Sequence, residues 1–304
     1  MAHPPFSVFN ARQTAELLDF TSLVDTIEAA AHDLAANRIN APERQVVPYP
    51  HDGVMLSMPA TAADIGIHKL VNVVPSNRGR RLATINGVVS AYDGITGEAL
   101  FVLDGPTVTL RRTAAVSMLG LRTLGPASPR CITLIGSGAQ ADGHALALAA
   151  LYPGCRVNVL GRSPESVRQF LERHQALNLH MQACEATAEE SDVVITLTTS
   201  ATPVYNEPAR ADRLLIGVGA FKPTLAEIGA TTLEGSALYV DDLAGARHEA
   251  GDFLQAGVDW SRVKPLVSAL ETRPATPEAR VFKTVGCAAW DLAAARCAMK
   301  RLAG

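Results

Sequence analysis

The stretch ITLIGSGAQADGHALALAAL, residues 132–151, has the spacing of a phosphate-binding turn. A β-rich run leads into Gly136-Ser137-Gly138, and an Ala/Leu-rich helical pattern follows, so the segment is typical of a G-x-G-x-x-A turn between a strand and a helix. The first glycine permits the tight turn, the second lets the backbone approach a pyrophosphate, and the small residue Ala141 lets helix and strand pack closely. Free N–H groups at the helix N-terminus attract an anion. The pattern predicts a dinucleotide-binding site.

The residues after the next strand-like run indicate which dinucleotide fits. In an NAD site, a carboxylate about 20 to 25 positions after the first glycine accepts hydrogen bonds from the adenosine ribose. Here that run is residues 156–160, and Gly161, Arg162 and Ser163 follow it without a carboxylate. Arg162 can pair with a 2′-phosphate, and Ser163 can donate a hydrogen bond to it. The sequence therefore favours NADP(H) over NAD(H), the alternative being that Arg162 is a solvated turn arginine.

Length, composition and charge exclude several classes of protein. The chain has 304 residues, of which 48% are hydrophobic and 19% charged, and its formal net charge is -3. These values fit a two-domain globular protein without a nucleic-acid partner. No apolar run is long enough to span a membrane, and the N-terminus lacks the charged-then-apolar order of a signal peptide. The cysteines form no C-x-x-C pair and the histidines no metal-binding spacing, so we expect free thiols, a cytoplasmic location, no membrane partner and no metal site.

The elements that must position these residues follow two patterns. Residues 10–38 show two helical patterns, the first opened by Asn10 with Gln13 three positions on, as in a capping box. From about residue 45 to 104, short β-rich runs alternate with turn signals, which predicts an antiparallel meander. After about residue 115, strands and helices alternate, which is typical of a parallel doubly wound sheet. Residues 280–303 form a strand-like run and an Ala-rich helix, and the pattern alone does not show whether this helix returns to the first domain.

The segment TLRRTAAVS (109–117), followed in the chain by GSGAQA, resembles the ornithine cyclodeaminase and mu-crystallin family. The likeness covers nearly the whole chain, and its other stretches are GIHKLVNVVP (66–75), LATINGVVSAYDGITGEALFVLDG (82–105), GVGAFKPTLAEI (217–228), EAGDFLQAG (249–257) and VFKTVGCAAWDLAAA (281–295). The resemblance implies an α/β protein with a Rossmann-type domain over residues 116–286. Residues 1–115 and 287–304 would form an α+β domain for substrate binding and homodimerisation.

The resemblance also implies roles for particular residues on the substrate side. Arg112 would hold a substrate carboxylate, Arg44 would be a second arginine directed at it, and Lys69 would lie beside the reacting carbon. Lys69 and Arg112 would be the catalytic residues, and Thr84 falls on a further substrate-side position. Without the resemblance, Arg44 and Arg112 could be surface arginines and Lys69 an outward-pointing strand lysine.

On the cofactor side, the implied contacts lie at the ends of strands and at the start of helices. Ala139 and Gln140 would lie along the pyrophosphate and Thr113 near the phosphates. Thr198 and Thr199 would face the ribose or the nicotinamide ring, although threonines at a strand end are also ordinary β-formers. The full predicted set is Thr113, Gly136, Gly138, Ala139, Gln140, Gly161, Arg162, Ser163, Thr198, Thr199 and Val218.

One position departs from the cyclodeaminases of this family. They carry a water-activating aspartate after the strand that corresponds to residues 214–220, and Phe221 stands at its place in this chain. Phenylalanine cannot act as a general base. Reductase-like members of the family lack that aspartate too, which favours hydride exchange over ornithine cyclisation.

The resulting hypothesis is an NAD(P)H-dependent reductase of a small cyclic imino acid, such as 1-pyrroline-2-carboxylate or 1-piperideine-2-carboxylate, with Phe221 as part of its substrate site. The product would be proline or pipecolate. Three alternatives remain open: a strict ornithine cyclodeaminase, a dehydrogenase of an acyclic amino acid such as alanine, and a non-catalytic ligand-binding protein like a crystallin.

Overall fold

The computed structural model describes residues 6–274 and 278–304, and the chain divides into two compact units. Unit 1 consists of Met1–Arg112 and Cys287–Gly304, and unit 2 is Thr113–Gly286. The boundary expected from the sequence, between residues 115 and 116, lies slightly further along the chain than the first boundary of the structure.

Unit 1 contains a six-stranded sheet in the order β1-β6-β5-β4-β3-β2. Its strands β2 to β6 pair antiparallel with their sequence neighbours, so the meander predicted from the sequence is confirmed. A short first strand, which was not expected, pairs parallel with β6. The strands are β1 (Ser7–Val8), β2 (Gln45–Pro48), β3 (Val54–Thr61), β4 (Ile65–Val73), β5 (Ile85–Asp93) and β6 (Ala99–Asp104).

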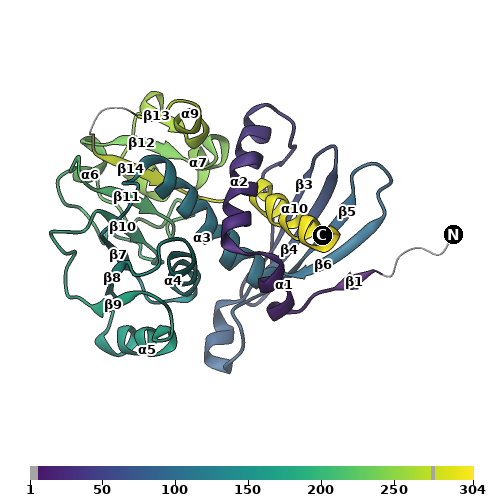
Figure 1. The fold of residues 1–304 in the computed structure, drawn as a ribbon, viewed down its shortest axis with the longest axis horizontal. Coiled ribbons are helices and arrows are strands. Elements are labelled where there is room, and N and C mark those ends of the chain that lie inside the picture. Colours follow the sequence, from purple (N-terminus) through teal and green to yellow (C-terminus); the bar gives the residue numbers. More distant parts are fainter. Residues whose placement is uncertain (1–5, 275–277) are drawn as a thin grey trace. The chain divides into compact units, whose positions relative to one another are not determined.

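Helices cover one face of this sheet. These helices are α1 (Ala11–Leu17), α2 (Phe20–Ala35) and α10 (Ala288–Ala303), and a 3-10 helix η1 (Pro75–Arg80) lies between β4 and β5. The predicted capping box opens α1, because the side chains of Asn10 and Gln13 each accept a hydrogen bond from the other's backbone N–H. The last helix, α10, packs beside α2 and against β4 and β3 (Figure 1). The C-terminal helix therefore returns to the first unit, as expected, and its many alanines permit the close contact.

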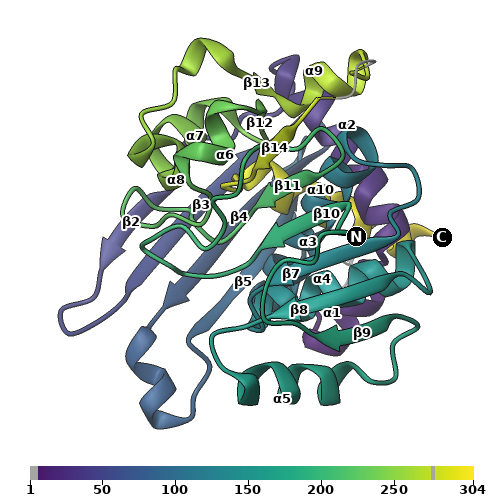
Figure 2. The same cartoon turned by 90° about the vertical axis from the view of Figure 1, so that its left-hand side faces the viewer.

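Unit 2 is built on an eight-stranded parallel sheet in the order β13-β12-β14-β11-β10-β7-β8-β9, visible in Figure 2. Its strands are β7 (Cys131–Ile135), β8 (Arg156–Leu160), β9 (His180–Ala183), β10 (Val193–Thr196), β11 (Leu214–Gly217), β12 (Ala237–Val240), β13 (Val263–Pro265) and β14 (Arg280–Lys283). Its helices are α4 (Ala139–Leu151), α5 (Pro164–His174), α6 (Ala230–Glu234), α7 (Leu243–Glu249), α8 (Gly251–Gln255), α9 (Leu266–Glu271) and η2 (Trp260–Arg262), and α3 (Gly105–Leu124) runs from unit 1 into it. The predicted α/β fold class with a doubly wound parallel sheet is confirmed.

None of the helices in the described part of the chain is both long and apolar enough to cross a membrane.

Candidate functional site

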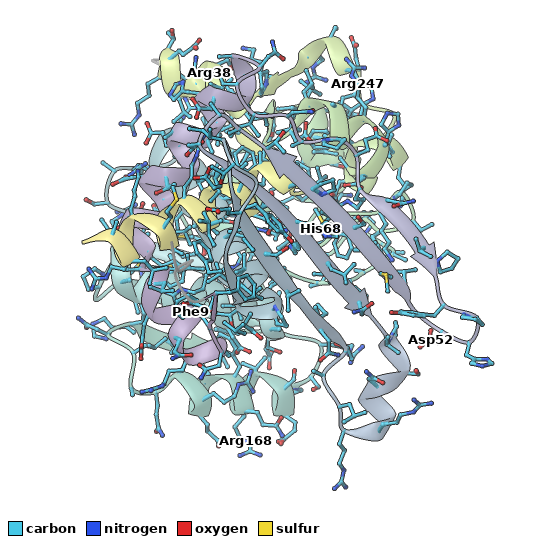
Figure 3. The ribbon with its side chains drawn as sticks, turned by 90° about the vertical axis from the view of Figure 1, so that its right-hand side faces the viewer. Phe9, Arg38, Asp52, His68, Arg168 and Arg247 are labelled. Carbon is cyan, nitrogen blue, oxygen red and sulfur yellow. The ribbon has the colours of Figure 1, made fainter. Side chains whose placement is uncertain are left out.

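Lys69 lies on the covered face of the six-stranded sheet. Along β4, buried and half-buried residues alternate, and Lys69 falls on the buried face with an exposed fraction of 2%. Its Nζ atom is 2.9 Å from Oδ1 of Asp291 on α10, which is fully buried. His68, labelled in Figure 3, lies on the opposite face of the strand and contacts Ser57 instead. Lys69 is therefore not an outward-pointing strand lysine.

The second cation at Asp291 is Arg112. The Nε atom of Arg112 lies 3.3 Å from the same Oδ1 atom that faces Lys69. Arg112 is 7% exposed, so it is not a surface arginine. Among the described residues, its guanidinium forms this ion pair but no hydrogen bond. The remaining donors of the guanidinium are thus left for a ligand that the protein itself does not supply.

Arg44 brings a third positive charge to the same face. Gln45 pairs with Ser57 and Met58 pairs with Lys69, so the register carried one residue further places Arg44 beside Met58, in the row of Lys69. Burial lowers the pKa of Lys69 to about 8, Asp291 acts to raise it, and Arg112 and Arg44 act to lower it further. Lys69 is therefore a lysine whose proton can be exchanged near neutral pH.

Thr84 does not join this group. Its carbonyl accepts a hydrogen bond from the N–H of Val74, five residues along the chain from Lys69. At about 3.3 Å per residue, this separation is roughly 16 Å along the strand. The structure thus gathers Arg44, Lys69 and Arg112 and leaves Thr84 outside.

The predicted dinucleotide turn of unit 2 follows β7 and leads into α4. Gly136 has a φ of 125°, and a Cβ atom there would lie 2.7 Å from the carbonyl oxygen of Leu197, so only glycine fits. Gly138 is the N-cap of α4 and supplies no capping side chain, and a Cβ atom built on it meets nothing within 4 Å. No capping side chain therefore occupies the first N–H groups of α4, which suits the pyrophosphate of a dinucleotide. Gln140 has a buried Oε1 atom without a hydrogen-bond partner among the described residues.

The residues expected to read the ribose phosphate lie after β8. Arg162 is exposed, and among the described residues it has no partner. Ser163 is the N-cap of α5 and its Oγ atom accepts from the N–H of Ser166 at 3.3 Å, which leaves its own hydroxyl proton to donate. Gly161 is half-buried directly before them.

The remaining predicted cofactor residues differ in their availability. Thr113 and Val218 are buried, and Thr199 is exposed. Thr198 donates its hydroxyl to Glu227 at 2.8 Å and accepts from the N–H of Ser200 at 3.3 Å, so this hydroxyl is already engaged.

Phe221 is exposed at the surface of unit 2, with an exposed fraction of 38%. The first carboxylate after it is Glu227, which is fully buried. Both oxygens of Glu227 accept hydrogen bonds, from Thr198 and from the backbone of Gly219 and Ala220. Glu227 is thus not free to activate water.

The sequence patterns did not indicate several buried charged residues of these two units. Asp291 is a lone acidic residue within the apolar stretch CAAWDLAAA, and that isolation was the signal that could have indicated it. Glu227 served only to align a segment, and Asp252 and Lys283 were not singled out, although all three are at most 1% exposed.

The parallel doubly wound sheet, with a G-x-G-x-x-A turn after its first strand, defines unit 2 as a nucleotide-binding domain of the Rossmann type. Unit 1 adds a buried carboxylate shared by two cations. The chain belongs to the ornithine cyclodeaminase/mu-crystallin family, whose family model matches residues 7–304. The resemblance predicted from the sequence is confirmed.

Related proteins are similar over nearly the whole chain. A protein of Azospirillum brasilense, named Delta(1)-pyrroline-2-carboxylate/Delta(1)-piperideine-2-carboxylate reductase, is 53% identical over 301 residues, which cover 98% of this chain and 97% of that protein. Among solved structures, the Delta(1)-pyrroline-2-carboxylate reductase of Thermococcus litoralis in complex with NADH and L-proline has a TM-score of 0.88 at 22% identity, covering 98% of both chains. An archaeal alanine dehydrogenase dimer with bound NAD has a TM-score of 0.85 at 21% identity, covering 98% of this chain and 96% of that one. The two structures share the fold of this chain.

Proposed function

We propose that this protein is an NAD(P)H-dependent reductase that converts a small cyclic imino acid, 1-pyrroline-2-carboxylate or 1-piperideine-2-carboxylate, to L-proline or L-pipecolate. The name and the 53% identity of the Azospirillum relative support this substrate class. The observation in the structure that carries the proposal is the buried group of Lys69, Arg112 and Asp291, with the guanidinium donors of Arg112 still unused.

The substrate half attracts a carboxylate. Lys69 and Arg112 bring two positive charges against the one negative charge of Asp291, a net of +1, and Arg44 acts on Lys69 from the same side of the charge balance. A planar guanidinium binds a carboxylate through two parallel hydrogen bonds, and a partly desolvated guanidinium gains most from such a partner. Arg112 would hold the substrate carboxylate, and Arg44 would add to the attraction.

Lys69 is suited to supply a proton. Addition of a hydride to the carbon of a C=N bond leaves an amine only if the nitrogen also receives a proton. The ammonium of Lys69, with a pKa lowered to about 8, is mostly protonated at pH 7 and can donate a hydrogen bond to the carboxylate or pass its proton towards the nitrogen. When bound, the nicotinamide cofactor supplies the hydride.

In unit 2, the turn before α4 fits a dinucleotide. The turn after β8 supports NADP(H) over NAD(H). Arg162 offers an unpaired guanidinium after β8, Ser163 offers a hydroxyl proton, and none of the three residues directly after that strand, 161–163, is a carboxylate that would repel a phosphate.

Two features favour reduction over cyclodeamination. Phe221 stands where a cyclodeaminase carries its water-activating aspartate, and Glu227 has both oxygens engaged. Neither residue is therefore available as a base for hydrolysis.

We also infer that the protein forms a homodimer through the face of the six-stranded sheet opposite α10. That face carries the exposed residues Val88 (42%) and Tyr92 (36%) on β5, and the half-buried Leu70 and Val102. Apolar side chains in a row on an uncovered sheet face are typical of an interaction surface.

A spectrophotometric substrate screen tests the proposed function. Oxidation of NADPH and NADH would be followed with each cyclic imino acid, and with pyruvate plus ammonia as the acyclic control. We expect fast oxidation with at least one ring and slow oxidation with the acyclic pair. Faster turnover of pyruvate plus ammonia would favour an alanine dehydrogenase, and no turnover at all a non-catalytic protein.

A further inference from the structure

We propose that Glu227, held by Asp252 and Lys283, is a positioning residue that fixes the carboxyl ends of β10 and β11 in the conformation that receives the nicotinamide half of the cofactor. This inference rests on the proposed function, because it assigns the two strand ends to a nicotinamide cofactor. It concerns residues of unit 2 to which neither the sequence patterns nor the turn before α4 gave a role.

Glu227 joins two strand ends with its two oxygens. Oε1 accepts from the N–H of Thr198 at 2.5 Å and from its hydroxyl at 2.8 Å, and Thr198 follows β10. Oε2 accepts from the N–H groups of Gly219 and Ala220 at 2.6 and 3.1 Å, and these residues follow β11. One carboxylate thus satisfies four donors from two segments that are distant in the chain.

The same segments touch each other and the dinucleotide turn. A Cβ atom at Gly219 would lie 1.8 Å from the carbonyl oxygen of Thr198, so the backbones of the two segments are in direct contact. Leu197 lies one residue before Thr198, and a Cβ atom at Gly136 would lie 2.7 Å from its carbonyl oxygen, so this backbone contacts the dinucleotide turn directly. Since ligands of doubly wound sheets bind outside the carboxyl ends of the strands, the segments held by Glu227 continue the site that begins at Gly136.

Asp252 and Lys283 hold Glu227 in turn. Oδ1 of Asp252 accepts from the backbone N–H of Glu227, and from that of Ile228 at 2.8 Å. Oδ2 of Asp252 pairs with Nζ of Lys283 at 2.8 Å, and Lys283 is the β14 residue opposite Gly217 of β11. Both partners of this ion pair are fully enclosed.

Such a cluster is a costly way to obtain stability alone. Burial raises the pKa of Glu227, and Lys283 and the N–H of Thr198 act in the opposite direction. Buried ion pairs often contribute no more stability than apolar side chains of the same volume, so their use is better explained by the specific conformation that they impose. Here that conformation is the one of residues 198–200 and 219–221.

The test uses Glu227→Gln, which retains the volume of the side chain. Glutamine has one acceptor oxygen, and its NH2 group can only donate, so it must lose the donors of either Thr198 or Gly219 and Ala220. We expect NADPH, titrated by fluorescence without substrate, to bind at least tenfold more weakly. In hydrogen exchange, the amides of those segments should lose protection while the rest of unit 2 keeps it. The KM for NADPH should rise and the KM for the imino acid should stay unchanged.

Glu207→Gln is the matched control, because Glu207 pairs with Arg213 in the same unit and contacts neither segment. It should bind NADPH like the wild type. Glu227→Asp, which is shorter by one methylene and reaches only one segment well, serves if Glu227→Gln does not fold, and we expect the same effects at smaller size. Wild-type affinity in the Glu227 variants, or loss of protection spread over all of unit 2, would overturn the positioning role.

The same titration separates this inference from the proposed function. A wild-type protein that binds no nicotinamide cofactor would overturn both. A wild-type protein that binds NADPH but reduces no imino acid would overturn the proposed function only, and the comparison of the variants would still decide the role of Glu227.

Discussion

Asp291 is the residue on which the arrangement of Lys69 and Arg112 depends. One oxygen of its buried carboxylate faces both Lys69 at 2.9 Å and Arg112 at 3.3 Å. Without that negative charge, two buried cations would repel each other with no compensation, a situation that proteins avoid. Asp291 thus permits two cations to share one face.

The charge of Asp291 predicts a pH effect. The protonated form of Lys69 is present below about pH 8 and is lost as the pH rises through that value, so kcat/KM should fall on the alkaline side. Asp291 raises the pKa of Lys69, so Asp291→Asn should move this falling limb to lower pH. The measurement is kcat/KM for the cyclic imino acid from pH 6 to 10 in both proteins; the substrate titrates identically in each, so the difference belongs to the protein. Asp64→Asn, which removes a carboxylate paired with Arg296, is the control and should keep the wild-type limb. Coincident limbs for wild type and Asp291→Asn would contradict the role of Lys69.

A second residue-level prediction concerns the choice of cofactor. Arg162→Ala should weaken NADPH binding by roughly tenfold or more, because an arginine and a phosphate form a charge-assisted pair, and it should leave NADH binding nearly unchanged. Ser163→Asp should shift preference towards NADH through repulsion of the phosphate. Dissociation constants from fluorescence titration check both variants. Equal losses for NADPH and NADH would show that Arg162 does not read the 2′-phosphate.

The family resemblance indicated Lys69 and Arg112 but not the partner that they share. Lys69 and Asp291 are 222 positions apart in the chain, and no local spacing connects residues at that distance. The contact between Lys69 and Asp291 depends on which face of β4 is buried and on the packing of α10 against that face, and both are decided by the tertiary structure. The same holds for Glu227, Asp252 and Lys283, whose contacts come from three separate segments.

At the scale of elements, the sequence predicted the features that depend on interactions between residues close together in the chain. The capping box at Asn10, the antiparallel meander and the turn before α4 depend on residues a few positions apart, and the structure has all three. Strand order in unit 2 was not predictable in this way. The late strand β14 lies between β11 and β12, and its position is decided by pairing across long chain separations.

A link between two helices yields a prediction about stability. His144 of α4 donates from Nδ1 to the carbonyl of Gln140 at 2.7 Å, and its Nε2 accepts from Ser117 of α3 at 2.8 Å. Burial lowers the pKa of His144 from its ordinary value of 6.5 to about 4, so the fold holds it neutral. As the pH falls from 6.5 towards 4, the unfolded chain takes up a proton that the fold does not, and stability is lost over that window.

His144→Gln removes this titration. The variant should be less stable than the wild type at pH 7.5. Between pH 7.5 and 4.5, however, its free energy of unfolding should decrease by about 2 to 3 kcal/mol less than that of the wild type. Urea unfolding at the two pH values provides the measurement. His180→Gln, at an exposed position of β9, should show the wild-type loss. A loss in His144→Gln as large as that of the wild type would contradict the neutral, buried state of His144.

At the scale of the whole molecule, a charge on the exposed sheet face tests the inferred homodimer. Val88→Asp places a charge on the uncovered sheet face, where Val88 is 42% exposed in the single chain. A charge buried without a partner at an interface costs several kcal/mol, so the variant should be monomeric at micromolar concentration. Light scattering coupled to size-exclusion chromatography gives the mass of each protein. A wild-type monomer, or a Val88→Asp dimer as stable as that of the wild type, would exclude this face as the interface.

We expect the protein to reduce a cyclic imine and not to release ammonia from an amino acid. Phe221 offers no base, and Glu227 is engaged by four donors, so neither residue is available to activate water for hydrolysis of an imine. The most direct measurement compares two rates in one preparation: NADPH oxidation with 1-pyrroline-2-carboxylate or 1-piperideine-2-carboxylate, and ammonia release from L-ornithine with NAD+. We predict rapid oxidation of NADPH and little or no ammonia. Rapid ammonia release matched by proline formation, with slow reduction of the added imines, would contradict the claim.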